Sequence, residues 1–236
     1  MYLTPAGLEL SSKYYLHFSR RVETAGNLTR TNIIEIIDYG MGNLRSVAKA
    51  FEHIGTDVRV SPEPEALASA DAVVLPGVGH FGDGMKHLKE KGLDKFVIDS
   101  IASGKPFLGI CLGMQLLMDE SEEAPGIPGL GVFRGKVIRF SESDLKVPHM
   151  GWNDVRVTES GKLLFRGIPD SSYFYFVHSF YVAPDDTEVS AGITEYGTEF
   201  SAALFRENIA ATQFHPEKSQ DCGLQLLENF IGLIGT

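Results

Sequence analysis

The stretch KPFLGICLGMQLL, residues 105–117, places a cysteine where a predicted strand meets a predicted helix. The apolar run KPFLGI (105–110) predicts a buried strand, and LGMQLLMDE (112–120) predicts a helix directly after it. Cys111 lies between Gly109 and Gly113, which is the spacing of the G-x-S-x-G nucleophile elbow with sulfur in place of the hydroxyl. Glycines are expected there because flanking Cβ atoms would collide at a sharp turn. Free N–H groups at the start of the helix favour a thiolate. Cys111 is therefore the candidate nucleophile, and a buried, inert cysteine is the alternative.

The rest of the chain divides into two regions that differ in their pattern of predicted strands and helices. Before Gly131, predicted strands alternate with helices, which indicates a parallel, doubly wound sheet. These strands are IIEIID (33–38), DVRV (57–60), DAVVLP (71–76) and KPFLGI. After Gly131 the segments are β-rich and separated by turns, with a hairpin turn expected at Glu207-Asn208: GKVIRF, NDVRV, SYFYFV, FYVAP, EVSAGI, FSAALFR and IAATQF. The predicted fold class is α/β, with a mostly parallel central sheet flanked by helices and an antiparallel β extension.

Capping residues and amphipathic patterns predict the helices. Asn43 can cap a helix that Gly55 closes, and Ser61-Pro62 can open a short helix. The last helix carries an apolar stripe that includes Leu227. The predicted helices cover 44–54, a short segment from Ser61-Pro62, 83–103 with a break near Gly92, 112–120 and 219–234.

Composition excludes several classes of function. The 236 residues carry a formal charge of −10, which argues against sequence-independent nucleic-acid binding. No apolar run reaches 18 residues, so no membrane span is expected. Two cysteines, Cys111 and Cys222, make neither a disulfide framework nor a zinc-cysteine cage. We therefore expect no metal and no cofactor, and a reducing cytoplasm as the compartment.

Residues 1–31 differ from the remainder of the chain. They show no clean period and no apolar core of the length that a secretory signal needs. An extension or a miscalled start is the simplest interpretation, and a transit peptide is the alternative. The expected catalytic domain is 32–236.

A thiol nucleophile needs a base and a group that orients the base. Only His215, in ATQFHPEKS (211–219), follows an apolar strand and is followed by a nearby carboxylate. After a turn at Pro216, Glu217 can reach the imidazole and support its charged form, as the third member of a triad does. A strand-ending turn with a solvated glutamate is the alternative.

An oxyanion hole is expected in LPGVGHFGDGM (75–85). Gly77 and Gly79 flank Val78 at a strand end, where backbone N–H groups are readily presented. The Leu112 N–H would be the second donor. A glycine-rich turn without function is the alternative, and the sequence contains neither a P-loop nor a dinucleotide fingerprint.

Several of these motifs together resemble a known family. PGVG, GICLGMQ and FHPE resemble the class I (triad) glutamine amidotransferases, whose core is flavodoxin-like. GHFGDGM, PHMGWN (148–153), YFVHSF (175–180) and FHPEKS (214–219) are similar to the glutaminase subunits of imidazole glycerol phosphate synthases in histidine biosynthesis. The resemblance covers residues 33–234.

The resemblance implies a substrate and a partner. Cys111 would attack the side-chain amide of L-glutamine and form a γ-glutamyl thioester. Ammonia would pass to a TIM-barrel cyclase subunit that makes imidazole glycerol phosphate and an aminoimidazole-carboxamide ribotide. The implied glutamine-binding residues are Gly77, Gly79, Gln115, Glu123, Ser179 and Phe180. The implied partner interface contains Trp152, Asn153, Tyr175 and Lys218.

Some of these assignments have plain structural alternatives. For Glu123 a place in a solvated charge cluster is an equal alternative, and for Trp152 a place in the core is one. For His149 a hydrogen-bonded structural role is favoured. For His178 this structural role and a role in lining the pocket are equally favoured.

Other functions also fit the motifs. They are a glutaminase of another synthase, such as the vitamin B6 or anthranilate enzymes, a stand-alone γ-glutamyl hydrolase, and a non-catalytic module on the same fold. An intact set of Cys111, His215 and Glu217 argues against the last. The resemblance also suggests that the Val78 peptide turns into the oxyanion hole only when the partner binds its ligand, and glycines at 77 and 79 would make that rotation easy.

Overall fold

A computed structural model describes residues 32–141 and 145–235 of the chain. The predicted extension, residues 1–31, lies outside the described residues. Within the described part, no helix has both the length and the apolar character needed to cross a lipid bilayer.

The first half of the sheet is parallel, as the alternating pattern predicts. Its strands lie in the order β2-β1-β3-β4-β12, and each pairs in parallel with its neighbour. This is the strand order of flavodoxin-like folds. The strands are β1 (Ile33–Ile37), β2 (Asp57–Ser61), β3 (Ala72–Gly77), β4 (Phe107–Cys111) and β12 (Ile209–Thr212).

The second half of the sheet is antiparallel and confirms the predicted β extension. From β12 the order continues β11-β10-β7-β8, and β9 joins β11 to β6. The predicted turn at Glu207-Asn208 joins β11 to β12, with Arg206 opposite Ile209 and Glu207 at a φ of 54°. The strands are β5 (Glu120–Ser121), β6 (Gly135–Arg139), β7 (His149–Val157), β8 (Ser172–His178), β9 (Phe180–Pro184), β10 (Ser190–Glu195) and β11 (Glu199–Arg206).

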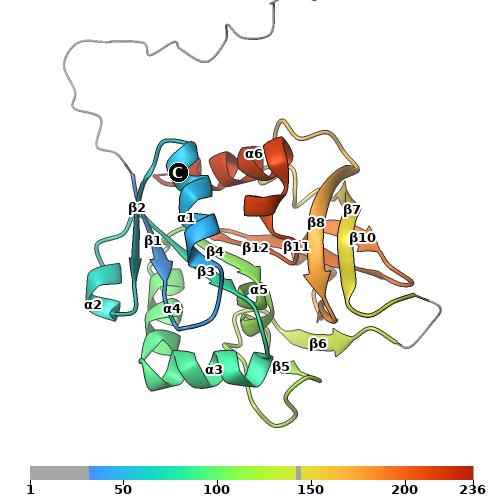
Figure 1. The fold of residues 1–236 in the computed structure, drawn as a ribbon, viewed down its shortest axis with the longest axis horizontal. Helices are drawn as coiled ribbons and strands as arrows, with labels where there is room; N and C mark the ends of the chain where they lie inside the picture. Colours follow the sequence, from blue (N-terminus) through green and yellow to red (C-terminus); the bar gives the residue numbers. More distant parts are fainter. Residues whose placement is uncertain (1–31, 142–144, 236) are drawn as a thin grey trace, which may run out of the picture. The chain divides into compact units, whose positions relative to one another are not determined.

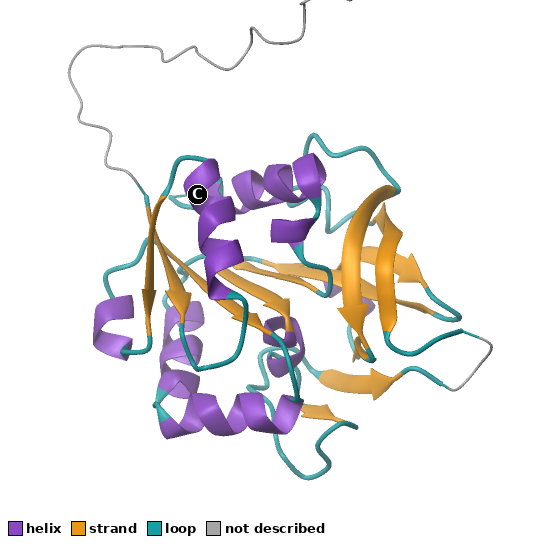
Figure 2. Cartoon of the chain, viewed as in Figure 1, coloured by secondary structure: helices purple, strands orange, loops and turns teal. Residues whose placement is uncertain are grey.

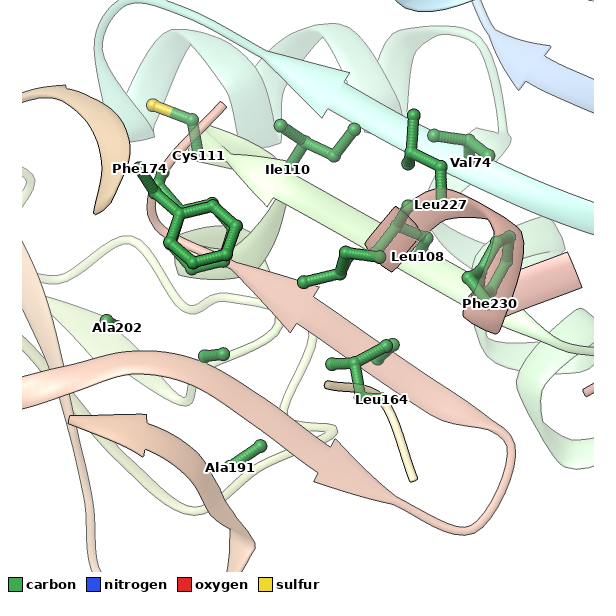
Figure 3. Close-up of a cluster of buried hydrophobic side chains, with 14 of the residues drawn as sticks. Val74, Leu108, Ile110, Cys111, Leu164, Phe174, Ala191, Ala202, Leu227 and Phe230 are labelled. Carbon is green, nitrogen blue, oxygen red and sulfur yellow. The ribbon is translucent and has the colours of Figure 1, made fainter. Parts of the chain in front are cut away.

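Helices cover both faces of the parallel strands (Figures 1 and 2). The helices are α1 (Leu44–His53), α2 (Pro64–Leu67), α3 (Phe81–Glu90), α4 (Leu93–Ala102), α5 (Leu112–Leu116) and α6 (Gln220–Ile231), with 3-10 turns η1 (Thr187–Val189) and η2 (Pro216–Lys218). Alternate residues of a strand point to opposite faces, so each strand contributes to two apolar clusters. Val74 and Leu108 pack with Phe51 of α1 and Phe230 of α6, as part of the cluster in Figure 3. Their neighbours in β3 and β4 pack with α3, α4 and α5.

Two local predictions at helix ends are wrong, and a third is confirmed in part. Asn43 occupies the N-cap position of α1, as predicted, but its side chain makes no capping hydrogen bond. The short helix starts at Pro64, not at Ser61-Pro62, because β2 continues through Ser61, which pairs with Ile37. The helix predicted over 112–120 ends at Leu116, since the Leu117 carbonyl accepts hydrogen bonds from residues 132 and 133 instead of continuing the helix.

Candidate active site

The predicted site residues gather where parallel strands end. The carboxyl ends of β3, β4 and β12 meet at one edge of the sheet, which is where open α/β sheets bind ligands. A cavity of about 370 Å³ lies there. Its lining consists of Val78, Gly79, Cys111, Leu112, Gln115, Glu123, Pro148, Val177, His178, Ser179 and Phe180. A larger cavity of about 490 Å³ in the antiparallel extension is lined by none of the predicted catalytic residues, so the smaller one is the candidate site.

Cys111 occupies a strained turn between β4 and α5. Its φ is 55° and its ψ is −110°, a region that non-glycine residues rarely adopt. A Cβ on Gly113 would lie 1.8 Å from the Leu75 carbonyl oxygen, and one on Gly109 would lie 2.9 Å from the Gly113 carbonyl oxygen. Both glycines are therefore required by the close approach of backbone, as the elbow motif predicts. Figure 3 shows the Cys111 side chain at one end of the apolar cluster.

His215 and Glu217 form a buried ion pair after β12. The His215 Nδ1 atom lies 2.8 Å from Glu217 Oε1, and the two side chains are 4% and 1% exposed. The prediction that Glu217 reaches the imidazole is confirmed, and the solvated-turn alternative is wrong. His215 Nε2 is buried and has no hydrogen-bond partner among residues 32–141 and 145–235, which leaves this nitrogen available for proton transfer.

The charges around His215 favour its imidazolium form. Burial by itself lowers the pKa of His215, but the interactions of the imidazole with Cys111 and with the hydrogen-bonded Glu217 carboxylate outweigh burial and raise this pKa to about 9. Cys111 Sγ also receives a hydrogen bond from Gln213 Nε2 at 3.7 Å. The three predicted catalytic side chains are thus electrostatically coupled.

The glycine loop after β3 borders the cavity through Val78 and Gly79. Val78 is 42% exposed, and Gly79 has a φ of 110°. A Cβ on Gly77 would lie 2.0 Å from the hydroxyl of Tyr39, so no side chain fits at this position. Val78, Gly79 and Leu112 line the cavity, whereas Gly77, a predicted glutamine-binding residue, is not among the lining residues.

The predicted glutamine-binding side chains also reach the cavity. Gln115 is 5% exposed, and its amide donates to the Phe180 carbonyl and to Gln213 Oε1, both at 3.0 Å. Glu123 is not part of a solvated cluster, because it lines the cavity and accepts a 2.7 Å hydrogen bond from the Phe81 N–H at the start of α3.

Three of the four predicted interface residues lie together at the surface: Trp152 on β7, Tyr175 on β8 and Lys218 in η2. Trp152 is 46% exposed, so it is not a core residue, and its ring lies 6.1 Å from that of Tyr175. Lys218 Nζ lies 5.7 Å from the centre of the Tyr175 ring. Asn153 does not join them, because neighbouring residues of a strand face opposite sides, and its amide donates to the Glu195 carbonyl.

Sequence reasoning missed Gln213 and Tyr39. Gln213 is fully buried and contacts both Cys111 and Gln115. A polar residue in the apolar run ATQF, two positions before His215, could have indicated it, since the run predicts a strand and residues two apart on a strand share a face, although β12 ends at Thr212. Tyr39 carried no such signal, because its place beside Gly77 depends on the packing of β1 against β3.

Comparison with known proteins identifies the class. A family model described as glutamine amidotransferase class-I matches residues 35–233, and the chain belongs to this family of enzymes. The solved structure of PurLQS from Thermotoga maritima has the same fold, with a TM-score of 0.68 and 17% identity over 86% of this chain and 99% of that chain.

Two relatives identify the subfamily within this class. Imidazole glycerol phosphate synthase subunit HisH 1 of Methanococcus maripaludis is 51% identical over 205 residues, which cover 86% of this chain and 100% of the relative. Subunit HisH of Methanothermobacter thermautotrophicus is 52% identical over 202 residues, covering 86% and 99%. Within the class-I glutamine amidotransferases, the chain belongs to the HisH subunits.

Proposed function

We propose that this chain is the glutaminase subunit of an imidazole glycerol phosphate synthase and that Cys111, His215 and Glu217 are its catalytic triad. The observation that carries the proposal is a strained cysteine in the wall of a cavity, coupled to a buried His215–Glu217 pair. A cysteine beside a base can act as a covalent nucleophile, because the base activates the thiol as a thiolate.

The proposed reaction has two steps. The Cys111 thiolate attacks the side-chain amide carbon of glutamine, and His215 Nε2 gives its proton to the departing ammonia. Water then attacks the resulting γ-glutamyl thioester and gives a proton to His215; the carbon–sulfur bond breaks, glutamate is released, and the Cys111 thiolate and the His215 imidazolium are restored. Glu217 holds His215 in one orientation and supports the imidazolium.

The remaining cavity residues are proposed to bind and polarise glutamine. The Val78 and Leu112 N–H groups would stabilise the oxyanion, each typically contributing about 2.7–4 kcal/mol. Gln115, Ser179 and Phe180 would contact the substrate, and the Glu123 carboxylate would meet its α-ammonium group. Gly77 and Gly79 would allow the Val78 peptide to turn toward the oxyanion.

The proposed partner is the TIM-barrel cyclase subunit, which would use the ammonia. We place its docking site on the exposed cluster of Trp152, Tyr175 and Lys218. Met150 and Tyr173, on the same two strands, are 62% and 59% exposed. Exposed aromatic residues of this kind are typical interface anchors. Asn153 would contribute through its position in β7, since its amide faces inward.

Domain organisation and compartment complete the proposal. Residues 32–236 would form the glutaminase domain, and residues 1–31 an extension whose presence an intact mass of the natively produced protein would decide. A cytoplasmic location would keep the Cys111 thiol reduced.

Glutamate release from glutamine tests the proposal. Wild type and Cys111→Ala are measured alone, with the cyclase subunit, and with the cyclase and its ribonucleotide ligand. Turnover that appears only in the full mixture and is lost in Cys111→Ala supports a partner-dependent glutaminase. Strong turnover without the partner would favour a stand-alone hydrolase. Absence of turnover in every mixture, with Cys111 still open to alkylation, would exclude this partner.

A further inference from the structure

Two buried histidines that the proposed reaction does not use connect strand β7 to the wall of the cavity. His149 and His178 are 3% and 6% exposed. They lie opposite each other in β7 and β8, and His149 Nδ1 is 2.9 Å from His178 Nε2. At one end, His178 Nδ1 lies 2.8 Å from the Phe180 carbonyl oxygen, and at the other, Asn153 Nδ2 lies 3.3 Å from His149 Nε2.

The groups at the two ends of this series of hydrogen bonds, Phe180 and Asn153, fix the tautomer of each histidine ring. The Phe180 carbonyl can only accept, so His178 Nδ1 carries a proton and His178 Nε2 accepts. His149 Nδ1 must then donate, and His149 Nε2 accepts from the Asn153 amide. Every ring nitrogen is used, and both rings are neutral. Burial lowers the pKa of His149 to about 4 and that of His178 to about 3, in agreement with this arrangement.

Aromatic neighbours hold the two rings in place. His149 stacks between Tyr196, at 4.0 Å, and Phe176, at 4.9 Å, with interplanar angles of 21° and 25°. Phe140 packs against His178 at 5.2 Å. These contacts restrain the planes of both rings, while the Phe180 carbonyl and the Asn153 amide set the direction of the hydrogen bonds.

The Phe180 carbonyl links the histidines to the catalytic pocket. It also accepts a hydrogen bond from Gln115 Nε2 at 3.0 Å, and Gln115 in turn contacts Gln213, the residue that donates to Cys111 Sγ. Ser179 and Phe180 themselves line the cavity. A displaced Phe180 carbonyl would therefore move both the backbone edge of the cavity and the Gln115 side chain.

We propose that His149 and His178 are positioning residues, a neutral hydrogen-bonded pair that fixes the Phe180 carbonyl and, through it, the glutamine-binding edge of the pocket. The role of that edge rests on the proposed glutaminase function. The pair acts on substrate affinity more than on the chemical step, because neither histidine contacts the triad by a hydrogen bond.

Variants of His178 distinguish its hydrogen bond to the Phe180 carbonyl from its hydrogen bond to His149. His178→Phe keeps an aromatic ring but removes both hydrogen bonds. His178→Asn keeps an N–H where Nδ1 lies and so retains a donor for Phe180. In the complex with the cyclase subunit and its ligand, we expect His178→Phe to raise KM for glutamine about tenfold or more, with kcat within about threefold of wild type. His178→Asn is expected to recover most of that loss, and the exposed His53→Phe on α1 is the matched control.

Nitrogen-15 NMR of histidine side chains tests the pair without any turnover. The expected result at pH 7 is a neutral Nδ1–H tautomer for both His149 and His178, with signals assigned by their loss in His149→Phe and in His178→Phe. A charged ring or an Nε2–H tautomer at either position would overturn the proposal. So would an unchanged KM in His178→Phe, or an equal loss in His178→Asn. A wild type that releases no glutamate would instead refute the glutaminase function, while the tautomers would still decide the pairing.

Discussion

Replacing Glu217 by glutamine is the sharpest test of the coupled charges in the site. The pKa of His215 is raised from 6.5 to about 9, which is equivalent to about 3 kcal/mol in favour of the imidazolium. Cys111 and Glu217 share this stabilisation. We therefore expect Glu217→Gln to return the pKa of His215 toward 6.5 and to slow glutamine hydrolysis about tenfold to a hundredfold, since about 1.4 kcal/mol corresponds to a factor of ten.

Alkylation of Cys111 measures the same effect in the isolated chain. Iodoacetamide labelling is followed from pH 6 to 10, and mass spectrometry separates Cys111 from Cys222. We expect Glu217→Gln to react about tenfold more slowly at pH 7, whereas Glu65→Gln, an equal charge change on exposed α2, should match wild type. Identical pH profiles for wild type and Glu217→Gln would refute the reasoning.

The same pKa makes a prediction about stability, and three substitutions add others. Because the folded-state pKa of His215 lies above its unfolded value, its contribution to stability is complete below about pH 6.5 and is lost as pH rises through about 9. Urea unfolding of the wild type should show this loss, and Glu217→Gln should show a smaller one. Gly113→Ala should lower stability by about 3 kcal/mol, because its Cβ would lie 1.8 Å from the Leu75 carbonyl oxygen. Glu35→Gln should raise the urea midpoint at pH 7, since burial raises the pKa of Glu35 and disfavours its charged form, and the gain should shrink in acid as wild-type Glu35 becomes protonated. Tyr39→Phe should raise the melting temperature, with a gain of about 1–2 kcal/mol, because the buried hydroxyl has no hydrogen-bond partner in the described part of the chain; a lower melting temperature would contradict this.

Local patterns were sufficient for the elements that carry the chemistry. The elbow around Cys111 could be predicted because a sharp, strained turn requires glycines at a fixed spacing, and this spacing is visible within a few consecutive residues. The pairing of His215 with Glu217 was predictable for the same reason, since both lie in one turn. Helix ends were less predictable. The helix after Cys111 stops at Leu116 because the carbonyl groups of residues 116–118 accept hydrogen bonds from the N–H groups of residues 130–133, which lie further along the sequence.

By itself, the sequence determined the α/β alternation, the antiparallel extension and which residues are the candidates for nucleophile, base and orienting carboxylate. The tertiary structure alone decided which side chains meet. Asn153 faces His149 while Trp152 faces outward, because the register of β7 and β8 assigns each residue to one side of the sheet. Gln213 reaches Cys111 because β12 lies beside β4, although the two residues are 102 positions apart. Such contacts depend on strand order, and strand order is set by packing over the whole domain and not by any local pattern.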